Sequence, residues 1–151
     1  MTTIAFDGKT VAADRQVTVG GTPVKAPFPK ITRVTYRGVK SIVGFTCGNV
    51  CHVMPVIEWI KNECPMDDAP DIHNEGKDFS LMLVNADGVF YSSESLILVP
   101  LGMVKWAVGS GSDFALGAMA AGANAKRAVT LTMGLDVSTG MGIDVLKVLA
   151  K

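Results

Sequence analysis

The amino terminus constrains the fold of this chain more than any other stretch, because it reads as a sheet strand from its first residues. The sequence begins MTTIAFDGKTVAADRQ, in which residues 2–6 and 10–14 alternate between the two faces expected of strands. Between them lies Asp7-Gly8-Lys9, a combination typical of a tight β-hairpin turn. Chain ends usually fray, so a start held inside a sheet indicates a structural or a chemical role for these residues.

The length of the hairpin loop decides which residues meet across it. A three-residue loop places Phe6 opposite Thr10 and Thr2 opposite Asp14, on the same face of the sheet. A two-residue loop would shift the pairing and move Asp14 to the other face. Asp14 then has a simpler interpretation, as a carboxylate at a strand end that caps the following turn.

The rest of the chain shows runs of strand patterns separated from runs of helix patterns. Strands are expected at residues 30–36, 41–46, 79–85, 89–92, near 105–108 and at 143–149. Helices are expected over residues 50–62, 113–128 and 129–137, whereas 17–29 is expected to be a loop with at most short strands and 64–77 a loop. This segregation favours an α+β fold with antiparallel sheets, formed by residues 1–151 as a single domain.

Composition limits the classes of partner. Apolar residues make up 48% of the 151 residues and charged residues 19%, which predicts a sizeable core and a surface partly covered by other subunits. Lysine plus arginine and aspartate plus glutamate both number 14, so net charge does not favour a nucleic-acid partner. No apolar run reaches the ~18 residues of a membrane span and the start lacks a signal-peptide pattern, which predicts a cytoplasmic protein without membrane association.

The cysteines do not form a disulfide or metal-binding pattern. Cys47, Cys51 and Cys64 are odd in number, as is usual in a reducing cytoplasm. Cys47 and Cys51 are four residues apart and His52 follows, but a metal site would need further ligands at suitable spacing. These thiols are better explained as small buried side chains along a helix.

Thr2 offers a specific chemistry. Methionine is commonly removed when the next side chain is small, and removal of Met1 would leave Thr2 with a free α-amine beside its hydroxyl. An α-amine has a reference pKa of about 7.7–8.0, so it can accept the hydroxyl proton near neutral pH. Many ordinary proteins also begin Met-Thr, so this dipeptide is weak evidence by itself.

Five stretches together resemble one family. TTIAFDGKTVAADRQ resembles the start of proteasome β subunits and of HslV-type proteases, which are N-terminal-nucleophile hydrolases. FPKITRV, IVGFTCGNV, AVGSGSDFALGAMAAGANAKRAV and LDVSTGMGIDVLKV resemble later parts of the same family in the same order. The resemblance spans most of the chain. It implies a four-layer αββα sandwich of two antiparallel sheets flanked by helices, and a threonine-type endopeptidase subunit of a ring-shaped, self-compartmentalised protease.

The resemblance also implies catalytic roles. The Thr2 hydroxyl would attack the substrate carbonyl, and its α-amine would accept the proton. Lys30, oriented by Asp14, would lower the pKa of the nucleophile, since a buried lysine without an acidic partner tends to lose its charge. Support around the α-amine would come from Ser110, Asp136 and Thr139.

Other matching residues would bind the substrate. Backbone N–H groups at Cys47 and Gly48 would stabilise the oxyanion. Thr18, Gly20 and Asn49 would line a groove in which an extended peptide adds as a strand. The expected substrate is therefore a peptide or an unfolded polypeptide.

The family likeness carries further expectations about ions and partners. No cofactor is required, but the backbone carbonyls of Met133, Asp136 and Thr139 would hold a structural Na⁺. The chain would form a homo-oligomeric ring, and an AAA+ unfoldase would be its partner.

Some of these residues also have simpler interpretations, and the sequence departs from the family pattern at two places. Lys30 could be a surface lysine at a strand start and Ser110 an ordinary turn residue, while Gly109-Ser110-Gly111 lacks the third glycine of a dinucleotide fingerprint. Cys47 stands where the family usually has glycine or a small residue, and only one helix follows instead of a pair. Two other functions therefore stay open: an amidohydrolase acting on a small amide, and a catalytically silent ring-assembly protein.

Overall fold

The computed structural model describes residues 2–72 and 78–151, and Met1 with residues 73–77 lies outside the described part. The strands are β1 (Thr3–Phe6), β2 (Thr10–Asp14), β3 (Gln16–Val19), β4 (Thr22–Lys25), β5 (Ile31–Tyr36), β6 (Val39–Thr46), β7 (Ser80–Asn85), β8 (Gly88–Ser93), β9 (Val99–Gly102), β10 (Trp106–Gly109) and β11 (Ile143–Lys147). The helices are α1 (Val53–Lys61), α2 (Ser112–Ala120) and α3 (Ala125–Thr132), with 3₁₀ turns η1 (Val50–His52) and η2 (Met66–Asp68).

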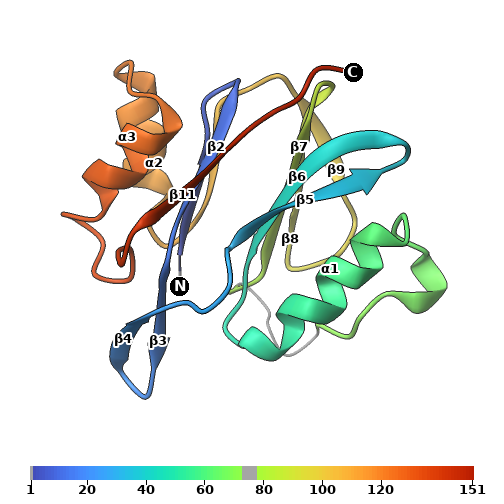
Figure 1. The fold of residues 1–151 in the computed structure, drawn as a ribbon, viewed down its shortest axis with the longest axis horizontal. Helices are drawn as coiled ribbons and strands as arrows, with labels where there is room; N and C mark the ends of the chain where they lie inside the picture. Colours follow the sequence, from blue (N-terminus) through green and yellow to red (C-terminus); the bar gives the residue numbers. More distant parts are fainter. Residues whose placement is uncertain (1, 73–77) are drawn as a thin grey trace.

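These elements form four layers, as expected (Figure 1). Helices α2 and α3 cover one sheet, whose strand order is β10-β1-β2-β11. The second sheet has the order β5-β6-β7-β8-β9, and α1 packs on its outer side. All pairings in both sheets are antiparallel, so the expected αββα sandwich is confirmed.

The alternation in β1 separates two cores. Ile4 and Phe6 are fully buried between the two sheets, whereas Ala5 faces α2 and α3 on the other side. The helix-facing layer is built mainly from alanines, among them Ala12 and Ala107, and such small side chains allow the helices to pack close to the sheet. Fixing both faces of β1 in this way holds the chain start in one register.

The hairpin register differs by one residue from the three-residue-loop expectation. Phe6 pairs with Val11, one residue beyond its expected partner Thr10. The predicted direct pairing of Thr2 with Asp14 across the ladder is therefore wrong. Their side chains still meet, at the end of the strands.

Asp7 explains the longer loop. Its carboxylate accepts hydrogen bonds from the N–H groups of Lys9 and Thr10, both at 2.9 Å, and its own N–H donates to the Thr10 carbonyl at 3.2 Å. An aspartate that binds the backbone of its own turn selects the loop geometry locally.

The segment predicted as one helix over residues 113–128 forms two helices instead. Gly122 has a φ of +102°, which L residues with side chains rarely adopt, and it turns the chain between α2 and α3. Asn124 then caps α3 by accepting a hydrogen bond from the Arg127 N–H at 2.9 Å. Gly122, one of the small residues in the span predicted as a single helix, is therefore the residue at which that span is interrupted.

The helix predicted over residues 129–137 is also wrong. Helix α3 ends at Thr132, whose carbonyl accepts the N–H groups of Leu135 and Asp136 at 2.9 and 2.8 Å. The chain thereby enters a tight loop that directs Asp136 toward the amino terminus of the protein.

Smaller differences concern the connections. The segment 17–29 contains the short strands β3 and β4, as expected, whereas β9 was not expected. Between α1 and β7, Met66–Asp68 form the 3₁₀ turn η2, and residues 73–77 of the predicted loop 64–77 lie outside the described part. Within the described part of the chain, no helix has the length and apolarity needed to cross a membrane.

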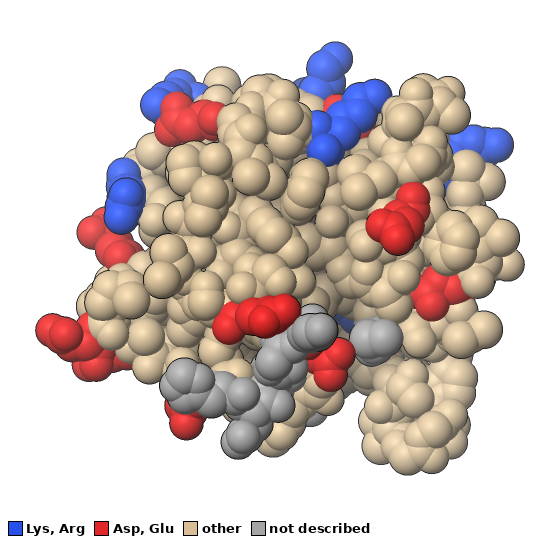
Figure 2. Space-filling view, turned by 180° about the vertical axis from the view of Figure 1, so that it is seen from behind, with Lys and Arg blue, Asp and Glu red and all other residues tan. Residues whose placement is uncertain are grey.

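Charged side chains are distributed unevenly on one face. In the view of Figure 2, lysine and arginine side chains gather toward the upper edge, whereas acidic side chains also lie across the middle and the lower half. A cationic ligand that approaches the lower half of this face meets mainly acidic groups.

Candidate active site

Thr2 lies at the start of β1, which runs between β10 and β2 in the middle of its sheet. The residue is only 4% exposed, and the following residue, Thr3, pairs with Gly109 of β10. Thr2 is therefore as buried as a core residue. This position orients its hydroxyl and its backbone nitrogen relative to the rest of the site.

Thr2, Asp14 and Lys30 meet through their side chains. The Lys30 ammonium donates to Thr2 Oγ1 at 2.5 Å and to Asp14 Oδ1 at 2.9 Å, and the Thr2 hydroxyl donates to the same Asp14 oxygen at 2.5 Å. The Lys30 side chain is 7% exposed and that of Asp14 fully buried, so this is a buried ion pair with a hydroxyl inserted in it. The interpretation of Lys30 as a surface lysine is therefore wrong.

Backbone groups hold the Asp14 carboxylate in place. Oδ1 accepts the Thr3 N–H at 3.0 Å, and Oδ2 accepts the N–H groups of Gln16 at 3.1 Å and Gly140 at 3.0 Å. A buried carboxylate is stable only when its oxygens are hydrogen-bonded, and these donors satisfy both. Asp14 can therefore fix the position of the Lys30 ammonium beside Thr2.

Burial changes the acidity of Lys30. Desolvation lowers its pKa, and the neighbouring Asp14 carboxylate counteracts this only in part, so the pKa lies below the ordinary 10.5. A lysine with a lowered pKa exchanges a proton more readily with the hydroxyl that it contacts. This environment favours formation of an alkoxide-like Thr2 oxygen.

A second network lies on the other side of Thr2. The hydroxyls of Ser110 and Thr139 both donate to Asp136 Oδ2 at 2.6 Å, and Thr139 Oγ1 also contacts Thr3 Oγ1 at 2.7 Å. Ser110 Oγ lies 3.5 Å from the Thr2 carbonyl oxygen. The loop after α3 and the turn after β10 are thus joined to the chain start, and Ser110 is more than an ordinary turn residue.

These hydrogen bonds set the charge of Asp136. Burial raises its pKa, but the hydrogen bonds from Ser110, Thr139 and the Ser138 N–H outweigh this effect, and the pKa lies below the ordinary 3.8. Asp136 is therefore ionised at neutral pH and presents a negative charge to the site around the Thr2 backbone.

We expect the stabilisation by Asp136 to depend on pH. A lowered folded-state pKa gives stability that is complete above pH 3.8 and is lost as the pH falls through the folded-state value. Asp136→Asn should therefore lower the free energy of unfolding by about 1–2 kcal/mol at pH 7 and by much less near pH 3. Urea denaturation at both pH values measures this, with the exposed Asp67→Asn as control, and a difference that does not change with pH would contradict it.

Gly109 allows the close approach between β10 and the chain start. Its φ is +101°, and a Cβ there would lie 1.8 Å from the Thr2 carbonyl oxygen. We expect Gly109→Ala to destabilise the protein by at least about 2 kcal/mol in urea denaturation. The control is Gly117→Ala in α2, where a Cβ meets nothing within 4 Å and the expected change is a slight stabilisation. Equal unfolding midpoints for the two variants would contradict this account.

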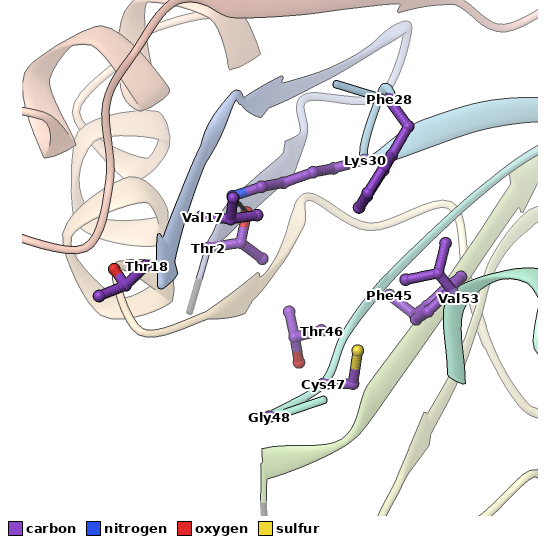
Figure 3. A pocket seen from close by; sticks show the side chains of 10 residues that line it. All are labelled: Thr2, Val17, Thr18, Phe28, Lys30, Phe45, Thr46, Cys47, Gly48 and Val53. Carbon is purple, nitrogen blue, oxygen red and sulfur yellow. Dashed lines mark hydrogen bonds between the residues drawn. The ribbon is translucent and has the colours of Figure 1, made fainter. Parts of the chain in front are cut away.

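A small cavity of about 80 Å³ opens beside the Thr2 side chain, and we call it the apolar cavity. Figure 3 shows Thr2 and the end of the Lys30 side chain on one wall, with residues of β6 and α1 on the other. The lining comprises Thr2, Val17, Thr18, Phe28, Lys30, Phe45, Thr46, Cys47, Gly48 and Val53. Val17, Phe28, Phe45 and Val53 give it an apolar part, which suits an apolar group.

The residues expected to bind substrate divide into two sets. Thr18, Cys47 and Gly48 line the apolar cavity, whereas Gly20 and Asn49 do not. Gly20 lies at the exposed tip of the β3–β4 hairpin. The Asn49 side chain instead accepts the N–H of Cys51 at 2.9 Å, which initiates the turn before α1.

The residues expected to hold Na⁺ lie at the end of α3 and in the loop that follows it. The Asp136 carbonyl accepts the Thr139 N–H at 3.1 Å, so it is already engaged within its own turn. A carbonyl oxygen has two lone pairs, so this hydrogen bond does not preclude coordination, and a Na⁺ held by the carbonyls of Met133, Asp136 and Thr139 stays a prediction. Among the described residues, no three histidine, cysteine, aspartate or glutamate side chains group as metal ligands do.

Several residues of the site were not identified from the sequence. Thr3 joins the second network, and Val17, Phe28, Phe45 and Val53 shape the apolar cavity. The cavity-lining residues read as ordinary strand and helix core positions, and only the folded arrangement brings them to Thr2. The repeated threonine at the start was the one available indication for Thr3.

Comparison with solved structures identifies the fold. HslV from Trypanosoma brucei superposes with a TM-score of 0.72 and 21% identity, covering 97% of this chain and 98% of that one. The chain has the fold of HslV. The N-terminal-nucleophile hydrolase fold expected from the sequence resemblance is thereby confirmed.

Two further structures have the HslV-like fold and match equally completely. The BPH protein of Thiobacillus denitrificans in complex with epoxomicin has a TM-score of 0.70 at 20% identity, over 99% of this chain and all of that one. The same protein in a second structure gives 0.67 at 20% identity, over 99% of both chains. No family model and no curated protein matches the sequence. At this identity the likeness concerns the fold, so residue roles must be argued from the geometry of the site.

Proposed function

We propose that this chain is a threonine-type endopeptidase that uses Thr2, exposed by removal of Met1, as its nucleophile. The observation that carries the proposal is the position of the Thr2 hydroxyl, 2.5 Å from both the Lys30 ammonium and the Asp14 carboxylate. A hydroxyl held by a buried ion pair at the start of a chain combines a nucleophile, a charge that stabilises its anion and an α-amine that can act as base. A purely structural ion pair would not require the hydroxyl of residue 2.

In the proposed reaction, Thr2 Oγ1 attacks the carbonyl carbon of a peptide bond. The hydroxyl proton passes to the α-amine of Thr2, and Lys30 stabilises the oxygen that loses it. The carbon–nitrogen bond then breaks, and the α-amine returns the proton to the leaving nitrogen, so that an acyl ester and a free amine result. Backbone N–H groups at Cys47 and Gly48, which border the same cavity, would stabilise the oxyanion.

The apolar cavity would receive the side chain of the residue that becomes the acyl group. Phe28, Phe45 and Val53 line it, and the cationic end of Lys30 is already bound to Asp14. Burying an apolar side chain here would contribute about 25 cal/mol per Å² of apolar surface removed from water. We therefore expect cleavage after apolar residues, with Cys47 limiting their size.

Assembly into a homo-oligomeric ring is part of the proposal. Large apolar side chains are exposed on α2, on α3 and in the loop after α3, namely Phe114 at 46%, Leu131 at 45% and Leu135 at 63%. Apolar surface of this kind is usually covered by a partner in the assembled protein. The proposal includes a cytoplasmic location, an unfolded polypeptide substrate and an AAA+ unfoldase as partner.

One measurement tests the nucleophile directly. The intact mass of the purified protein should lack methionine, and treatment with epoxomicin, the compound in one of the Thiobacillus structures, should add one covalent adduct. Thr2→Ala should show no adduct. A chain that retains Met1 and forms no adduct would contradict the peptidase and favour the silent assembly protein, whereas cleavage of small amides alone would favour the amidohydrolase.

A further inference from the structure

A second cavity borders Thr2 on the side opposite to Lys30, and we call it the polar cavity. Its volume is about 270 Å³, larger than the apolar cavity, and Thr2, Thr46 and Cys47 separate the two. It lies between β10 of one sheet and the β7–β8 pair of the other. The nucleophile therefore stands between two cavities of different chemical character.

The lining of the polar cavity is rich in hydroxyl groups. Four residues with hydroxyl-bearing side chains line it, namely Ser80, Tyr91, Ser110 and Ser112, and so does the acidic residue Asp78. Ala107 and Val108 are its main apolar contributors. Such a lining suits a polar side chain that can donate several hydrogen bonds.

The proposed transfer of a proton from the Thr2 α-amine to the leaving nitrogen assigns the polar cavity to the leaving-group side of the scissile bond. Ser110 lines this cavity and its Oγ lies 3.5 Å from the Thr2 carbonyl oxygen, so the backbone of Thr2 faces it. Lys30 lies at the apolar cavity instead. Because the leaving nitrogen must receive its proton from the α-amine of Thr2, the leaving group has to depart on the polar side.

Charges near the polar cavity favour a cation. Asp78 lines it directly, and Asp136 is bound to its lining residue Ser110. Lys30 lines the other cavity and is paired with Asp14 at 2.9 Å. The positive end of α2 is offset by Asp113 in its first turn.

We propose that the polar cavity binds the first residue on the leaving-group side of the scissile bond and prefers lysine or arginine there. This inference rests on the proposed function, because it requires an acyl ester on Thr2. Together the two cavities define the preferred substrate as a bond that joins an apolar residue to a basic one. Acidic residues are disfavoured at the second position by Asp78.

Competition between amines for the acyl ester tests the polar cavity directly. In this step the amine nitrogen forms a bond to the acyl carbon, the ester bond to Thr2 Oγ1 breaks, and the amine proton returns to that oxygen. With a fluorogenic peptide amide as acyl donor, the ratio of aminolysis to hydrolysis is measured for argininamide, norleucinamide and glutamic acid 1-amide. We expect the ratio for argininamide to exceed that for norleucinamide about fivefold, with glutamic acid 1-amide lowest.

Asp78→Asn is the matched variant. The Asp78 backbone carbonyl accepts the Thr46 hydroxyl at 3.2 Å, and this hydrogen bond is retained in the variant. In this variant the ratio of aminolysis to hydrolysis for argininamide should fall to about the ratio for norleucinamide. Asp67→Asn, on η2 and outside both cavity linings, should keep the full preference.

The outcomes separate this inference from the proposed function. Equal ratios for the three amines, or a preference that survives in Asp78→Asn, would overturn the inference while leaving the peptidase intact. If no acyl transfer or hydrolysis occurs with any donor, the proposed function fails. Binding of argininamide to the polar cavity is then measured by chemical-shift changes in NMR spectra of the protein. Binding lost in Asp78→Asn would support a basic-group site in this cavity, and absence of binding would overturn it.

Discussion

Thr2→Ala is expected to abolish peptide-bond cleavage, with a loss of about 10³-fold or more in kcat/KM. The variant removes the only atom proposed to bond to the substrate, and the remaining groups can bind a peptide but cannot acylate. Its fold should persist, because Lys30 still pairs with Asp14 at 2.9 Å and a single hydrogen-bonded hydroxyl contributes only about 1 kcal/mol. Cleavage of a fluorogenic peptide, together with a urea denaturation curve, measures both effects.

Thr2→Ser provides the control for the nucleophile. It removes a methyl group but keeps the hydroxyl and the α-amine, so it should retain measurable cleavage and accept the same covalent inhibitor. If Thr2→Ala and Thr2→Ser lose activity equally, or if Thr2→Ala stays active, the hydroxyl is not the attacking group.

Lys30→Met is the second large effect. It replaces the ammonium by an apolar group of similar length and leaves the fully buried Asp14 carboxylate without its cation. We expect a loss of about 3 kcal/mol in the free energy of unfolding, at the lower end for a broken buried pair because backbone N–H groups still bind both carboxylate oxygens. We also expect cleavage by the folded fraction to fall by at least about 100-fold, because no charge stabilises the Thr2 oxygen.

Two further variants separate the causes. Lys25→Met, on the exposed strand β4, removes a cation without touching the site and should be neutral in both measurements. Asp14→Asn combined with Lys30→Met should recover much of the lost stability without recovering cleavage. Full activity in Lys30→Met would contradict the proposed role of the ammonium.

Local patterns in the sequence were sufficient to predict most elements. The strand pairs around tight turns, the helix after the Cys47-Gly48 turn and the final strand all form close to the expected positions. These features depend on alternation and turn residues, which act over a few positions. The four-layer arrangement came from the resemblance to a family.

Register and helix ends depended on contacts that a pattern does not reveal. The carboxylate of Asp7 lengthens the first hairpin loop and also accepts the Ala125 N–H at 2.8 Å, at the start of α3. One side chain thus settles a strand pairing and the beginning of a helix far along the chain. Gly122 lies inside the span predicted as one helix, 113–128, although its φ of +102° turns the chain between α2 and α3.

The residues of the candidate site were likewise predictable from the sequence only in part. Thr2, Asp14 and Lys30 were identified through the family resemblance, and the structure brings all three within hydrogen-bonding distance. The two cavities were not predictable, because their walls combine residues from distant strands that read individually as core. Gly20 and Asn49 match the family pattern yet lie outside the apolar cavity, so sequence position alone did not fix their contacts.

The placement of β1 in the interior of its sheet has a practical consequence for handling this protein. An affinity tag or fusion partner joined to the amino terminus would be anchored at a residue that is 4% exposed and flanked by strands on both sides. Purification handles therefore belong at the carboxyl end, where the Lys151 side chain is 60% exposed. Recombinant material prepared with an uncleaved leading tag would also lack the free α-amine of Thr2 that the proposed mechanism requires.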